Sequence, residues 1–283
     1  MKKVLVTTDF SAASKSAIRF AINWAAQQSL ELVFTHVYSV MQPTGWSQSV
    51  LKKYEEKEIN LVTEKLKNFI EEMYQQAGIR SRKWSVMVLS GVDAHVTLLY
   101  HTKKNPVYDC ICISTRGAGK FKKFFGTNTG NLITKSEIPV LAIPKDYKTT
   151  TLTSVMYATD LNNYNEEIEK VVAFARPLKA KIDIVHFAWP NEILFEDELI
   201  ATALKKRFKY GVEFHIEQTD PLHSLIQNLE QQIKKRKPSV VVMFTNQRRT
   251  FFQRMFLSSK SEELSFRTTV PLLVYNKHEK DAG

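Results

Sequence analysis

The chain has 283 residues, of which 43% are hydrophobic and 24% charged, a composition that excludes intrinsic disorder and a coiled coil. This length fits two domains of roughly 140 residues each. The 40 basic and 29 acidic residues give a net charge of +11, but the excess is scattered over short clusters and does not favour nucleic-acid binding. No apolar run approaches the ~20 residues of a membrane span. No cleavable signal sequence is found at the start. Cys110 and Cys112 lie two residues apart on one predicted strand and could not readily form a disulfide. We therefore expect a cytoplasmic protein.

Short apolar runs alternate with amphipathic stretches along the first half. The predicted strands are Lys3–Thr8, Glu31–Tyr38, Lys83–Leu89, Tyr108–Ser114 and Val140–Pro144. The predicted helices are Ser11–Gln27 with Ser11 as its N-cap, Ser49–Gln76, Asp93–Lys103 and Asn128–Lys135. Near-continuous apolar strands are typical of a parallel sheet covered on both faces. The alternation therefore predicts a doubly wound α/β sandwich.

The second half repeats the first in the same order. The matching segments are Val4–Asp9 with Val155–Asp160, Phe34–Val37 with Ile184–Phe187, Ile111–Ser114 with Val242–Thr245, and Ile138–Leu141 with Val270–Leu273. The predicted strands of the second copy are Ser154–Thr159, Lys181–Trp189, Glu213–Gln218, Ser239–Phe244 and Leu272–Tyr275. Self-similarity of this kind indicates a duplicated domain. We expect domains at 1–147 and 148–283, joined through Lys145–Leu152.

Two stretches at the carboxyl ends of predicted strands carry the candidate site. One is Thr7–Ser11 after the first strand. The other runs from Ser114 to Gly130 and holds four of the chain's nine glycines. Glycine lets backbone N–H groups approach an anion, and Gly126-Thr127 opens onto a helix N-terminus, which suits a phosphate. A carboxylate at Asp9 can accept hydrogen bonds from ribose hydroxyls or an adenine amine. A surface loop collects the same residue types, so spacing alone leaves both interpretations open.

These motifs and the duplication resemble a tandem universal stress protein. The resemblance implies two five-stranded parallel sheets of order 3-2-1-4-5, a Rossmann-like fold of the adenine nucleotide alpha hydrolase type. It also implies ATP or another adenine nucleotide, with or without Mg, between the first and fourth strands. The family fingerprint Gly-x2-Gly-x9-Gly-(Ser/Thr) appears here as Ser114-x2-Gly117-x8-Gly126-Thr127, without the leading glycine and one residue short. Carried over by position, the nucleotide-binding residues are Thr7, Asp9, Val37, Ile113, Ser114, Gly117, Gly126, Thr127, Asn128 and Thr129.

The second copy departs further from that fingerprint. Its equivalent segment reads Thr245-x2-Arg248-x9-Ser258-Ser259 and has lost every fingerprint glycine. Side chains at these points crowd a triphosphate and restrict the loop to negative φ. We interpret this copy as a partner domain that does not bind a nucleotide. A small anionic ligand held by Arg248, Arg249 and Arg254 is the competing interpretation.

The other groups of reactive side chains give weaker evidence for a functional site. His36 and His186 occupy matching strand positions, which favours a shared structural role. The remaining histidines show no ligand spacing, so the sequence predicts no metal site. No catalytic residue is assigned, because no nucleophile elbow or general base can be identified.

The family resemblance implies a bacterial, cytoplasmic stress-response module that binds an adenine nucleotide through its first domain and adjusts its contacts with protein partners. A scaffold without nucleotide binding and a slow ATPase are the alternatives. The resemblance also implies an intramolecular pseudo-dimer through Ile138–Pro144 and Val270–Tyr275, with or without a further homodimer.

Overall fold

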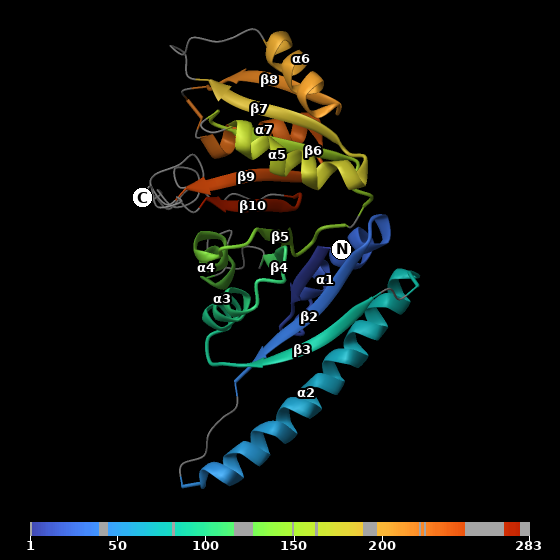
Figure 1. The fold of residues 1–283 in the computed structure, drawn as a ribbon, viewed down its shortest axis with the longest axis vertical. Helices are drawn as coiled ribbons and strands as arrows, with labels where there is room; N and C mark the ends of the chain where they lie inside the picture. The colour runs from blue at the N-terminus through green and yellow to red at the C-terminus, as the bar shows by residue number, and fades with distance from the viewer. Residues whose placement is uncertain are drawn as a thin grey trace. The chain divides into compact units, whose positions relative to one another are not determined.

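The computed structural model describes residues 2–39, 45–80, 83–115, 127–148, 150–161, 164–188, 197–220, 222–223, 225–246 and 269–277. The chain divides into two compact units, and the second begins a continuous run at Thr150. Each unit has five parallel strands with helices beside them (Figure 1). Among the helices described, none combines the length and the apolar character that crossing a membrane requires.

The first unit has the strand order β3-β2-β1-β4-β5. Its strands are β1 (Lys2–Thr7), β2 (Leu30–Tyr38), β3 (Trp84–Ser90), β4 (Cys110–Thr115) and β5 (Val140–Pro144). The central strands form the core because their apolar residues face helices on both sides of the sheet, as Val4, Leu5 and Val6 show by being completely buried. The predicted fold class is confirmed for this unit.

Two pairs of helices accompany the sheet of the first unit. They are α1 (Ser14–Gln27) with α2 (Gln48–Ala77), and α3 (Ala94–Lys104) with α4 (Thr127–Lys135). Right-handed crossovers place the two pairs on opposite faces, because the chain reverses direction across the sheet after β3. Helix α2 begins at the cap Ser47 and ends at Gly78, whose φ of +63° is the left-handed conformation that glycine tolerates. Its fully buried residues all lie in its C-terminal half.

The predicted start of the first helix at Ser11 is wrong by three residues, because α1 begins at Ser14. The Ser11 carbonyl accepts a hydrogen bond from the Ser14 N–H at 3.1 Å. Ser11 therefore belongs to a turn that precedes the helix, and Ala13 occupies the cap position without a side-chain cap.

The second unit repeats this topology with the order β8-β7-β6-β9-β10. Its strands are β6 (Ser154–Thr159), β7 (Lys181–Ala188), β8 (Val212–Gln218), β9 (Val240–Asn246) and β10 (Leu272–Lys277). Its helical segments are α5 (Tyr164–Ala175), the short 3-10 turn η1 (Arg176–Leu178), α6 (Asp197–Phe208) and α7 (Leu225–Arg236). Numbered within the unit, the strand order is again 3-2-1-4-5, so the prediction of two tandem doubly wound sheets is confirmed.

The hydrogen-bond register corrects the alignment of the fourth strands by one residue. The recurring bonds run from the Ile111 N–H to the Pro139 carbonyl and from the Val241 N–H to the Pro271 carbonyl, both at 2.9 Å. Ile111 therefore corresponds to Val241, whereas the sequence comparison paired it with Val242. As a result, Ser114 corresponds to Phe244.

Both cysteines are free and buried in β4. Burial raises the pKa of Cys110 to about 12 and raises that of Cys112 well above its usual value. Because the thiolate is the reactive form, we expect neither thiol to react with a chromogenic disulfide reagent at about pH 8 in the folded chain. Both should react in guanidinium chloride, which controls for the reagent. Absorbance of the released thiol measures the outcome, and rapid reaction of either cysteine without denaturant would contradict its buried position.

Candidate functional site

A cavity of about 190 Å³ lies where β1, β2 and β4 of the first unit reach their carboxyl ends. β1 lies between the other two strands in the sheet. The connection after β1 leads toward β2 and the connection after β4 leads toward β5, so the two connections leave this point in opposite directions. Ligands of open α/β sheets bind at such a switch point. The cavity is smaller than the ~300–1,000 Å³ of sites for drug-sized ligands, so it fits part of a nucleotide, such as the nucleoside.

The turn after β1 forms the polar edge of this cavity. The Asp9 carboxylate accepts a hydrogen bond from the Ser11 N–H at 3.0 Å. The Thr8 hydroxyl accepts one from the Phe10 N–H at 3.1 Å and lies 2.8 Å from the Ser14 hydroxyl. Phe10 has a φ of +61°, which is rare for a residue with a side chain. These local bonds hold the Asp9 carboxylate at the end of β1.

The second unit contains the same turn. Leu161 has a φ of +62°, and its N–H donates to the Thr159 hydroxyl at 3.0 Å. The two histidines at matching strand positions also make equivalent contacts. His36 Nδ1–H donates to the Thr8 carbonyl at 2.8 Å, and His186 Nδ1–H donates to the Thr159 carbonyl at 3.1 Å. Each histidine therefore fastens the turn after the first strand to the second strand of its unit.

Three helices of the first unit begin at the cavity. Ser14 of α1, Ala94 of α3 and Asn128 of α4 all contribute to its lining from the first turns of their helices. The N-terminus of a helix carries partial positive charge and free N–H groups, which attract anions. The Asp93 side chain already caps α3 by accepting from two backbone N–H groups. The starts of α1 and α4 thus remain for an added negative group, and α4 is the helix that follows the predicted Gly126-Thr127 segment.

Ser114 connects β4 to the helix that follows β1. Its hydroxyl donates to the Ala13 carbonyl at 2.6 Å and lies 3.0 Å from the Ser16 hydroxyl. Beside it, Val37 and Ile113 give the cavity apolar walls from the strands on either side of β1. The arrangement offers a small apolar space with polar groups at one end.

Seven of the ten residues predicted for the site line the cavity, namely Thr7, Asp9, Val37, Ile113, Ser114, Asn128 and Thr129. Thr127 is the first residue of α4, and Gly117 and Gly126 lie outside the described residues. Arg248, Arg249 and Arg254, which were considered for an anion in the second copy, also lie outside them.

Eight further residues that the prediction did not include line the cavity: Thr8, Ser11, Ala13, Ser14, Thr35, His36, Ala94 and Leu98. Thr8 and Ser11 lie within the predicted Thr7–Ser11 stretch, Ala13 and Ser14 follow it, and Thr35 and His36 precede Val37, so neighbouring positions gave a signal for them. Ala94 and Leu98 come from α3, and the sequence carries no signal for them. The neighbours of an apolar helix residue are known only from the folded chain.

At the equivalent positions of the second unit, the side chains are larger. The strand register places Tyr157 at the position of Val6 and Phe244 at that of Ser114, and the shared turn places Glu167 at that of Ser16. Of these three first-unit residues, Ser114 is the one that lines the cavity. The Phe244 ring stacks on Tyr275 with 4.9 Å between centroids and meets the Tyr157 ring edge-on at 5.6 Å. An aromatic cluster therefore takes the place of Ser114, and a carboxylate that of Ser16.

Tyr157 and Glu167 form a buried pair within this cluster. Tyr157 is completely buried, Glu167 is 4% exposed, and the tyrosine hydroxyl donates to the glutamate carboxylate. Burial, followed by the nearby negative charge of Glu167, raises the pKa of Tyr157, so the hydroxyl keeps its proton at neutral pH. The pair places a bulky, satisfied polar group where the first unit has the buried Val6 and Ser16.

Comparison with known proteins gives a consistent result. The model of a family described as the universal stress protein family matches residues 1–144. A universal stress protein from Archaeoglobus fulgidus DSM 4304 has a solved structure similar to this chain, with a TM-score of 0.72 at 19% identity over 97% of this chain and 98% of its own. A proposed universal stress protein from Pseudomonas aeruginosa UCBPP-PA14 gives a TM-score of 0.59 at 13% identity, covering 98% of this chain and 93% of its own. None of the curated proteins compared with the chain matches it. At these identities the two structures support the fold of both units.

Proposed function

The chain belongs to the universal stress protein family, and from this premise we propose that its first unit binds an adenine nucleotide at the carboxyl ends of β1, β2 and β4. The base lies between the apolar walls of Val37 and Ile113. The ribose hydroxyls donate to the Asp9 carboxylate. The phosphates extend toward the start of α4. By the family resemblance Gly117, Gly126 and Thr127 contact them, and the complete ligand is ATP with Mg.

One observation carries the proposal: a cavity with apolar walls, a carboxylate at its edge and the start of a helix all meet at the switch point of the sheet. Each part matches one part of a nucleotide, because bases are flat and apolar, ribose donates hydrogen bonds and phosphates are anionic. The second unit supports the restriction to one site, since Phe244 occupies there the position of Ser114, which lines the cavity of the first unit.

We further propose that the protein acts in the cytoplasm as a stress-response module whose contacts with protein partners depend on nucleotide occupancy. The two free, buried thiols of β4 support a reducing compartment.

Isothermal titration calorimetry of the full chain tests the proposal directly. ATP, ADP, AMP and cyclic AMP are titrated separately, with GTP as a control for the base and inorganic phosphate as a control for the anion. We expect one adenine nucleotide per chain and little or no heat from inorganic phosphate alone. Absence of binding by every adenine nucleotide, for protein shown to be folded by circular dichroism, rules the proposal out. Two nucleotides per chain would contradict the restriction to the first unit.

A further inference from the structure

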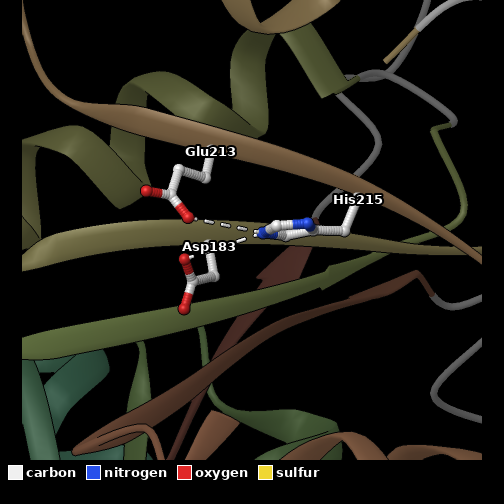
Figure 2. Close-up of side chains that lie close together, drawn as sticks. All are labelled: Asp183, Glu213 and His215. Carbon is white, nitrogen blue, oxygen red and sulfur yellow. Dashed lines mark ion pairs between the residues drawn. The ribbon is translucent and has the colours of Figure 1, made fainter. Parts of the chain in front are cut away.

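Three side chains that can bind a metal ion meet on one face of the sheet in the second unit. Asp183 on β7 pairs in register with Glu213 on β8, and His215 follows two residues later. Residues two apart on a strand point to the same face, so the pairing brings all three together. Figure 2 shows one nitrogen of the His215 ring pointing toward both carboxylates.

The distances between these groups are close to those of a metal site. His215 Nε2 lies 3.9 Å from Asp183 Oδ1 and 3.7 Å from Glu213 Oε2. One ligand atom from each of the three residues lies within 4.8 Å of the others. Tetrahedral zinc with bonds of about 2.0–2.1 Å brings its ligand atoms to roughly 3.3 Å from one another. Binding an ion would require the three ligand atoms to move closer together.

His215 Nε2 lacks a hydrogen-bond partner among the residues that the structure describes. This nitrogen is shielded from solvent, although the His215 side chain as a whole is 28% exposed. Buried polar atoms are nearly always satisfied, and an exception calls for a partner such as an ion. Both carboxylates lie too far away to accept a hydrogen bond from it. An ion between the three groups satisfies this nitrogen and both carboxylates at once.

The neighbouring charges leave the two carboxylates available. Arg236 and Lys235 both pair with Glu217, at 2.7 Å and 3.1 Å. In the described part of the chain, neither Asp183 nor Glu213 has an ion pair with a lysine or an arginine.

We propose that Asp183, Glu213 and His215 bind a first-row divalent cation, with Zn²⁺ as the best fit. One imidazole and two carboxylates are ligands that zinc accepts, and three protein ligands leave its fourth position to water. The Glu213 side chain is 64% exposed, which gives the ion a path from solvent. The ion joins β7 to β8 and stabilises the second unit independently of the nucleotide site in the first.

The test uses the full chain without an affinity tag, freed of metal with a chelator and studied without nucleotide. Zinc affinity and stoichiometry are measured by competition with a chromophoric chelator, and Co²⁺ absorption reports on the ligands. We expect one Zn²⁺ per chain and a loss of at least about 100-fold in affinity for His215→Gln and for Asp183→Asn, since even outer-shell partners of a metal are worth 10–100-fold. The matched control is His223→Gln, because His223 also pairs with a carboxylate, that of Asp220 at 2.7 Å, in the same unit.

Absence of a zinc site, or equal zinc affinity in His215→Gln and the parent chain, overturns the proposal and leaves His215 as a member of an ion-pair network. An equal loss in His223→Gln overturns it as well, because binding is then not specific to these ligands. If His215→Gln does not fold, Glu213→Gln is used instead, because the exposed Glu213 side chain tolerates the change. Loss of the Glu213 carboxylate must still weaken zinc binding and alter the Co²⁺ spectrum.

Discussion

Replacing Ser114 with phenylalanine is expected to abolish adenine-nucleotide binding while the chain stays folded. Ser114 lines the cavity of the first unit, and the corresponding position of the second unit already holds Phe244. The larger ring occupies space that a nucleoside needs, so affinity should fall at least about 100-fold, equivalent to roughly 2.7 kcal/mol. Calorimetric titration measures the loss, and thermal unfolding without ligand shows that the fold is retained.

The matched control for this variant is Ser85→Phe, which makes the same replacement at an exposed position of β3 in the same unit. It should bind nucleotide as the parent chain does. Unchanged affinity in Ser114→Phe would place the nucleotide elsewhere. If Ser114→Phe fails to fold, Asp9→Asn takes its place, because asparagine keeps an oxygen for the Ser11 N–H but removes the charge. That variant should lose about tenfold in affinity.

Removing the hydroxyl of Tyr157 is expected to destabilise the second unit by about 1.5–3 kcal/mol, because it takes a hydrogen bond from a buried carboxylate. The measurement is amide hydrogen exchange by mass spectrometry in Tyr157→Phe. Peptides from β6 and α5 should exchange about 10- to 150-fold faster. Peptides from β1 and α1 serve as an internal reference.

Two further variants show whether the pair with Glu167 causes this loss. Tyr54→Phe is the control, because Tyr54 packs edge-on against Trp46 and no hydrogen bond to its hydroxyl is found among the described residues. It should change stability by less than about 0.5 kcal/mol. In a double-mutant cycle, Glu167→Gln should cost less in the Tyr157→Phe background than alone. Strictly additive effects would mean that the two side chains do not stabilise each other.

The strands were the most predictable part of the fold. Buried parallel strands are nearly continuous apolar runs between polar turns, so their positions follow from the sequence to within a few residues. The alignment of the two fourth strands slipped by one residue for the same reason. Ile111 fits opposite either Val241 or Val242 when every neighbour is apolar, and only hydrogen bonds to the next strand decide between them.

The site was predictable where it depended on the ends of strands. Thr7, Asp9 and Ser114 could be placed because the carboxyl ends of parallel strands lie together at one edge of a sheet. The contribution of α3 could not, because Ala94 and Leu98 carry no chemical signal and reach the cavity only through packing. The start of α1 was misplaced because serine is a common N-cap residue, but Ser11 lies in the turn that precedes the helix. The cluster of Asp183, Glu213 and His215 could not be predicted from the sequence either, because Asp183 lies on a different strand from the other two residues.

The positive φ angles of Phe10 and Leu161 have a consequence for how such sites diverge. Strained backbone is often taken as a mark of function. Here it occurs in both units, although the first unit has Ser114 where the second has Phe244. The strain is therefore a property inherited with the fold and older than the difference between the halves. After duplication, each half could change its side chains while keeping the same backbone frame, and a ligand site could be lost in one copy without unfolding it.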